Sequence, residues 1–132
     1  MCIRDRPYLF SNSLAPSIAG ASLATLDLLK SSGDLLTKLR ENTEYFRSEM
    51  TRRGFEIPES DHPIVPVMVG DAVKAAKMAD AMLAKGIYVR AFSYPVVPKG
   101  KARIRTQMSA GLTREQLDKA IKAFEEARAE IG

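Results

Sequence analysis

Four stretches of the chain carry apolar residues at spacings of three and four, which is the period of an amphipathic α-helix. They run from about Pro16 to Ser31, from Asp34 to Gly54, from Asp71 to Gly86 and from Thr113 to Ile131. Asp34 is suited to cap the second helix, and the two glycines are suited to end the second and third in a left-handed conformation. Thr113 followed by Gln116 is a capping box, which defines the start of the last helix.

The first of these helices differs from the others. Its apolar and small residues cover most of the circumference, whereas the other three have a single apolar stripe. A helix that is apolar nearly all round is buried on more than one side. We therefore expect it to need more surrounding protein than the rest of this chain supplies.

Three further stretches have the composition or the alternation of β-strands, at Ile64–Val69, Ile87–Tyr94 and Ala102–Ser109. Pro63 and Pro66 favour an edge or irregular position for the first strand, because proline cannot donate to a ladder. The element order predicts an α/β chain in an α+β arrangement. We expect a small, mainly antiparallel three-stranded sheet with helices on one face, preceded by one long helix.

The composition is that of one globular domain: 132 residues, 45% apolar and 27% charged, with a formal net charge of +4. The basic residues are scattered among acidic ones, so we expect no nucleic-acid partner. The only cysteine, Cys2, excludes an internal disulfide, and no apolar run reaches the roughly 18 residues of a membrane span. The only histidine, His62, has no second ligand near it, so we expect no metal site. These features predict a cytoplasmic protein with no membrane partner.

The third predicted strand offers candidate binding chemistry. Arg103, Arg105, Gln107 and Ser109 alternate with apolar positions and therefore share one face of the strand. A guanidinium held on a rigid strand suits bidentate capture of a carboxylate. The alternative is an ordinary solvated outer face, which the pattern alone favours.

The segment before the first helix offers a second candidate. Ser11 and Asn12 lie shortly before Pro16, where free backbone N–H groups and the helix dipole attract anions such as phosphate. The alternative is plain capping of the helix by these side chains.

Three motifs carry a resemblance to a known family. They are RPYLFSNSLAP from Arg6, HPIVPVMVGD from His62 and YPVVPKGKARIRTQMSA from Tyr94. Together they resemble the C-terminal part of the α-oxoamine synthases, which are pyridoxal 5'-phosphate (PLP) enzymes of the aspartate aminotransferase fold. The resemblance extends from about Arg6 to Gly132, and the third motif is the most specific.

The resemblance implies a PLP-dependent C-acetyltransferase that interconverts 2-amino-3-oxobutyrate plus CoA with glycine plus acetyl-CoA, in threonine breakdown. It implies that Arg105 binds the substrate carboxylate. It also implies that Ser11 and Asn12 reach the cofactor phosphate of the partner subunit in a homodimer. Two alternatives stay open: another α-oxoamine synthase, making 8-amino-7-oxononanoate or 5-aminolevulinate, and a non-enzymatic regulatory domain that binds a small molecule.

The resemblance also implies that this chain is a C-terminal fragment. The lysine that binds the cofactor lies upstream in the family, and none of the nine lysines here has its setting, so no catalytic residue is assigned and we expect the fragment to be inactive alone. Leu112 stands where relatives usually have histidine. The expected organisation is a non-native leader at 1–5, a phosphate-contact segment and interdomain helix at 6–32, and a C-terminal small domain at 33–132.

Overall fold

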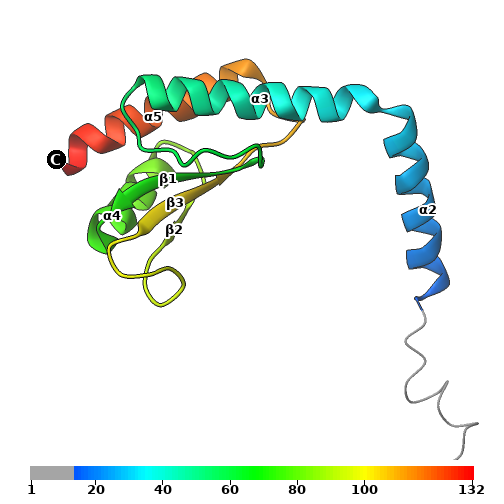
Figure 1. The fold of residues 1–132 in the computed structure, drawn as a ribbon, viewed down its shortest axis with the longest axis horizontal. Helices are drawn as coiled ribbons and strands as arrows, with labels where there is room; N and C mark the ends of the chain where they lie inside the picture. The colour runs from blue at the N-terminus through cyan, green and yellow to red at the C-terminus, as the bar shows by residue number, and fades with distance from the viewer. Residues whose placement is uncertain (1–13) are drawn as a thin grey trace, which may run out of the picture. The chain divides into compact units, whose positions relative to one another are not determined.

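The computed structural model describes residues 14–132, and their elements follow the predicted order (Figure 1). The helices are α2 (Pro16–Ser31), α3 (Gly33–Arg52), α4 (Ala72–Ala84) and α5 (Arg114–Ile131). The strands are β1 (Ile64–Gly70), β2 (Arg90–Phe92) and β3 (Ala102–Gln107). The chain divides into two compact units, one ending at Asp34 and one formed by Leu35–Gly132, and each is described by itself.

The first unit contributes one described helix, α2. Pro16 stands in its first turn, where the missing N–H costs nothing, and no side chain caps the helix. None of the residues of α2 is buried, and its large apolar side chains are exposed on all sides. None of the described helices is long and apolar enough to cross a membrane.

In the second unit the strands form one antiparallel sheet in the order β1-β3-β2. β1 is an edge strand, as its prolines predict, and β3 is central. Two strands are shorter than predicted: β2 covers Arg90–Phe92 instead of residues 87–94, and β3 ends at Gln107 instead of Ser109. Alternation indicates extended backbone, but a ladder also needs a neighbour, and β2 pairs with β3 only from Arg90 to Phe92.

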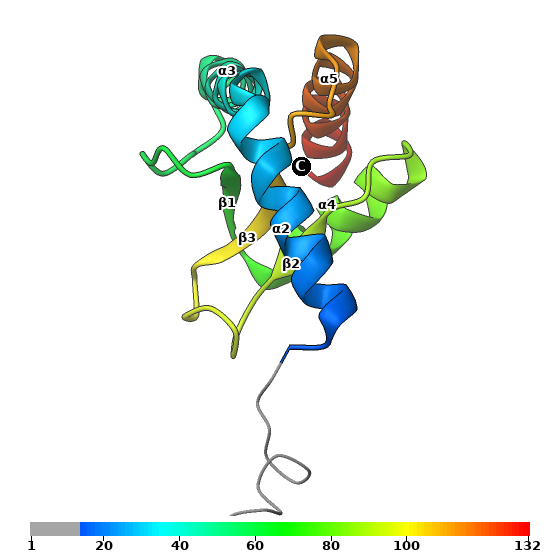
Figure 2. The ribbon, with the colours of Figure 1, turned by 90° about the vertical axis from the view of Figure 1, so that its right-hand side faces the viewer.

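All three helices of the second unit cover the same face of the sheet, as predicted (Figures 1 and 2). Val65, Val67 and Ile104 on the sheet meet side chains from α3, α4 and α5 in a single core. The aromatic centre of the core is Phe124, whose ring meets Phe46 edge-on at 6.4 Å between centroids. The fully buried side chains of the core are Phe46, Phe124, Met50, Met82, Ile104, Leu117, Ile121, Val65 and Val67.

The helix ends follow the capping chemistry of the sequence with one exception. Gly54 and Gly86 adopt positive φ angles of 76° and 78° after α3 and α4. Thr113 and Gln116 form the predicted capping box at the start of α5. The exception is Asp34, which does not cap α3, because that helix already begins at Gly33. Asp34 lies in the first turn instead, where its charge still favours the positive end of the helix dipole.

The outer edge of β1 has partners for its backbone groups. The Ile64 N–H donates to Nδ1 of His62 at 3.0 Å, and the Met68 N–H donates to the Glu56 carbonyl at 3.0 Å. Pro66, between them, has no N–H. Arg47 of α3 donates to the Ile64 carbonyl at 3.3 Å.

Candidate functional site

The two faces of β3 have opposite surroundings. Ile104 and Thr106 point into the core, and the Thr106 hydroxyl donates to the Val65 carbonyl at 2.7 Å. Arg105 and Gln107 are exposed on the other face, which no helix covers. The alternation predicted from the sequence is therefore confirmed.

Arg105 is held at the centre of this open face. It lies on the central strand, directly opposite Pro66 of β1 on one side and Arg90 of β2 on the other. Its guanidinium carbon lies 5.8 Å from the centroid of the Phe92 ring, within the range of a cation–π contact. Strand pairing on both sides fixes the backbone, so the guanidinium is carried by a rigid element.

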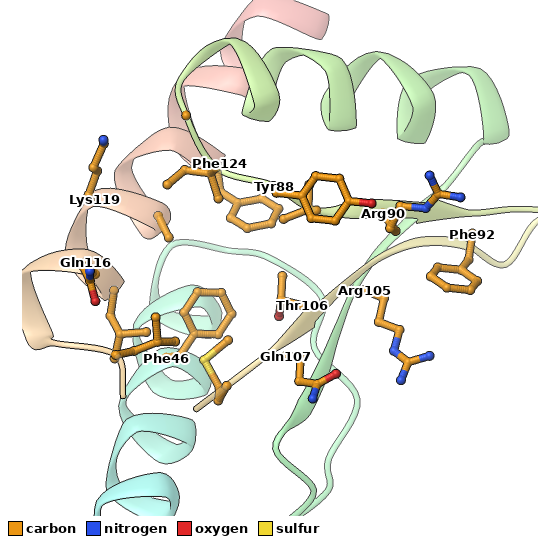
Figure 3. A pocket seen from close by; sticks show the side chains of 17 residues that line it. Phe46, Tyr88, Arg90, Phe92, Arg105, Thr106, Gln107, Gln116, Lys119 and Phe124 are labelled. Atoms are coloured by element: carbon orange, nitrogen blue, oxygen red, sulfur yellow. The ribbon is translucent and has the colours of Figure 1, made fainter. Parts of the chain in front are cut away.

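A cavity of about 650 Å³ opens beside Arg105, where β2 and β3 stop pairing (Figure 3). Its floor is apolar and includes Phe46, Leu117 and Phe124. Polar side chains along its walls include Gln107 and Gln116. The size and the combination of an apolar floor with a few polar groups are typical of small-molecule sites.

The charge of the cavity has one sign. Its lining includes Arg90, Arg105 and Lys119, and none of the described residues that line it is Asp or Glu. A cleft with charges of one sign and walls of low dielectric concentrates the field and attracts the opposite ion. The arrangement therefore suits a small anion, or a ligand with an anionic end.

Several cations on the helical side of the unit are paired, in contrast. Arg53 bonds to Glu49 and lies 3.1 Å from Glu125, and Lys85 lies 2.7 Å from Glu130 and 3.3 Å from Glu126. The hydrogen bond from Arg53 is the main cause that lowers the pKa of Glu49, with a second from Arg52. The hydrogen bond to Glu130 raises the pKa of Lys85 in the same manner.

Sequence reasoning found Arg105 but missed Arg90 and Lys119. Arg90 lies in a predicted strand, and alternation places it on the same face of that strand as Phe92. Its position opposite Arg105 depends on the strand register, which alternation does not specify. Lys119 comes from α5, and only the packing of that helix brings it to the cavity.

The other candidates have various outcomes. Ser11 and Asn12 lie outside the described residues, as does the expected leader. His62 accepts a backbone hydrogen bond in the turn before β1. Leu112 packs half-buried against the core, lines the cavity, and accepts a hydrogen bond at its carbonyl from Asn42 at 3.0 Å. Within residues 14–132 no group of three or more His, Cys, Asp or Glu side chains could hold a metal ion.

Comparison with known proteins places the chain in a family. The family model for class I and II aminotransferases matches residues 1–124. The chain is 50% identical over 129 residues to 2-amino-3-ketobutyrate coenzyme A ligase of Escherichia coli K12, covering 98% of this chain and 32% of that protein. It is 40% identical over 129 residues to 8-amino-7-oxononanoate synthase of Symbiobacterium thermophilum, covering 98% of this chain and 33% of that protein.

A solved structure of serine palmitoyltransferase with PLP matches with a TM-score of 0.87 and 29% identity, over 96% of this chain and 32% of that one. The chain thus spans about a third of the length of the curated relatives it matches. The family model covers most of the chain, and the solved structure has the same fold over nearly all of it. The chain belongs to the class I and II aminotransferase family.

Proposed function

We propose that this chain is the C-terminal part of a PLP-dependent acyltransferase that interconverts 2-amino-3-oxobutyrate plus CoA with glycine plus acetyl-CoA. The observation that carries the proposal is Arg105, rigidly held beside a cavity whose described lining has no acidic residue. The higher identity to the ketobutyrate ligase than to the oxononanoate synthase, 50% against 40%, supports this choice of substrates. Family membership favours an enzyme over a regulatory binding domain.

In this proposal Arg105 binds the carboxylate of glycine or of 2-amino-3-oxobutyrate. Its guanidinium presents two parallel N–H donors to the two carboxylate oxygens, which fixes the orientation of the amino acid as well as its position.

The donor set of the cavity fits the carboxylate end of an amino acid substrate of a PLP enzyme. When bound, PLP supplies an electron sink for the charge that develops at the substrate α-carbon. We assign its phosphate contacts to Ser11 and Asn12, acting across a homodimer interface, as the sequence motif implies. The expected segment 6–32 would then serve the cofactor and residues 33–132 the substrate.

The test of this proposal is the Arg105→Ala variant of the full-length enzyme. Loss of a charge-assisted, bidentate pair costs about 1.5–3 kcal/mol, so the KM for glycine should rise about 10- to 150-fold. Steady-state kinetics with glycine as the varied substrate measures this. Arg105→Lys keeps the charge but not the two parallel donors. Its KM for glycine should therefore lie between that of Arg105→Ala and that of the wild type.

An unchanged KM for glycine in Arg105→Ala would contradict the role of this residue. It would indicate that Arg103 or another group binds the carboxylate.

The choice of acyl donor needs its own assay. The full-length enzyme should turn over glycine with acetyl-CoA faster than with the longer acyl-CoA thioesters that an oxononanoate synthase type of enzyme would take. A preference for a longer acyl group would move the assignment to that alternative.

The lysine that binds the cofactor is proposed to lie outside this chain. Borohydride reduction of the 132-residue chain in the presence of PLP should therefore leave no stoichiometric adduct on one defined lysine. A stoichiometric adduct would show that the chain carries the lysine itself. A cytoplasmic location stays a prediction from the sequence.

A further inference from the structure

The cavity is lined by a second arginine, Arg90, in addition to Arg105. Arg90 of β2 lies directly opposite Arg105 of β3 in the antiparallel ladder. Side chains in such a pair leave the same face of the sheet with their Cβ atoms about 4.5–5.5 Å apart, and like charges in this position destabilise the sheet. The register thus makes the two side chains direct cross-strand neighbours on the same face of the sheet.

Neither arginine forms an ion pair with an acidic side chain of the described part of the chain. The ion pairs among residues 14–132 involve Lys30, Arg52, Arg53, Lys85 and Lys122, and neither Arg90 nor Arg105 is among them. The cavity lining adds Lys119, a third cation. An ordinary solvated surface would intersperse acidic side chains, as the helical side of this unit does.

Arg90 lies among aromatic residues that also line the cavity. Tyr88 and Phe92, two residues before and after it, also line the cavity. In Figure 3 the Arg90 and Arg105 guanidinium groups lie on either side of the Phe92 ring. When Arg105 binds a carboxylate with two parallel donors, the donors of Arg90 remain available for an oxygen of the same carboxylate or of a second anion.

We propose that Arg90 is a second oxyanion-binding residue of this cavity. The inference rests on the proposed function for the identity of the ligands. The oxyanion is a carboxylate or a phosphate, and two sources can supply it: the carboxylate of the amino acid substrate and the phosphate groups of CoA.

The test uses the Arg90→Gln variant of the full-length enzyme, with two kinetic arms. The KM for glycine is measured at saturating acetyl-CoA, and the KM for acetyl-CoA is measured at saturating glycine. We expect an increase of about 3- to 30-fold in one of them, because the pair is partly exposed to solvent. The arm in which the increase occurs identifies the source of the oxyanion.

A third arm checks a phosphate source. S-acetyl-N-acetylcysteamine carries the same thioester without phosphate groups. If Arg90 binds a phosphate of CoA, Arg90→Gln should leave the KM for this short thioester unchanged while raising that for acetyl-CoA.

Two further variants separate a direct contact from a general loss of positive charge. Lys101→Gln removes a cation immediately before β3 that does not line the cavity, and should leave both KM values within about twofold of the wild type. Arg90→Lys keeps the charge and should restore part of the lost affinity. Equal KM values for Arg90→Gln and wild type, or equal effects of Arg90→Gln and Lys101→Gln, would overturn the inference.

Failure of the proposed function is recognised separately, as a wild-type enzyme that does not turn over glycine with acetyl-CoA. In that case calorimetric titration with inorganic phosphate and with acetate replaces the kinetic arms. Weaker binding of either anion to Arg90→Gln than to both the wild type and Lys101→Gln supports the role of Arg90. Binding of equal strength to all three proteins refutes it.

Discussion

The two sides of the sheet use charged residues in opposite ways. On the helical side, Arg53 and Lys85 each contact two glutamates. On the open side, Arg90 and Arg105 are opposite each other in the strand register, and no described acidic side chain forms an ion pair with either. The same residue types thus have acidic partners in one region and none among the described residues in the other.

This difference distinguishes charged side chains that stabilise the folded state from charged side chains that do not. Paired charges on the helical side tie α3 and α4 to α5, and their partners belong to the same chain. The arginines of the open face add repulsion instead of attraction to the folded state. A charge arrangement that does not help folding is better explained by a ligand that supplies the missing anion.

The sharpest test of this separation compares neighbouring residues on β3. Ile104→Ala removes a fully buried side chain and should lower the free energy of unfolding by about 2–5 kcal/mol. Arg105→Ala, one residue further on, should change it by no more than about 0.5 kcal/mol. Urea denaturation followed by circular dichroism measures both. Comparable losses would mean that Arg105 supports the fold, and the comparison would fail.

A polar side chain on the helical side should behave like the core. Asn42 of α3 is 5% exposed and donates from Nδ2 to the carbonyls of Ser109 and Leu112, both at 3.0 Å. Asn42→Ala leaves these carbonyls without their donor, so we expect a loss of about 1–3 kcal/mol in the same denaturation experiment. The exposed neighbour Glu41 provides the control, since Glu41→Ala should be close to neutral. Equal stability of the two variants would contradict the role of Asn42.

The smallest expected effect concerns the paired charges themselves. The pKa of Glu49 is lowered in the folded state by hydrogen bonds from Arg53 and Arg52. A carboxyl group whose pKa is lowered by folding stabilises the folded state at pH values above its ordinary pKa of 4.5. This contribution is lost as the pH falls through the lowered pKa. Glu49→Gln should therefore have a lower Tm than the wild type at pH 7, and the difference should shrink in acid.

Thermal unfolding between pH 7 and pH 3 tests this expectation. Glu59→Gln removes an exposed carboxylate that forms no ion pair among the described residues, and its Tm difference should stay nearly constant. A Tm difference for Glu49→Gln that is the same at both ends of this range would show that the ion pairs add nothing to the fold.

Local chemistry in the sequence predicted much of this fold. Gly54 and Gly86 end helices because they adopt positive φ angles, and Thr113 with Gln116 begins one because two side-chain hydrogen bonds replace missing backbone partners. Alternation along β3 predicted the face on which Arg105 lies. Each of these features depends on residues a few positions apart.

Features that depend on distant residues were not predictable in the same way. The loop between β2 and β3 does not specify a register, so the position of Arg90 opposite Arg105 is a property of the folded sheet. The early end of the β2–β3 ladder, which opens the cavity, has the same origin. The contribution of Lys119 depends on how α5 packs.

The outer edge of β1 also affects how copies of this chain can interact. An exposed edge strand is a template for a strand from another molecule, which is a common route to aggregation. Here His62 and Glu56 occupy the outward N–H groups of Ile64 and Met68, and Pro66 has none to offer. A foreign strand would find no free donor along this stretch. Intermolecular strand addition at β1 is thus blocked by Pro66, His62 and Glu56 together.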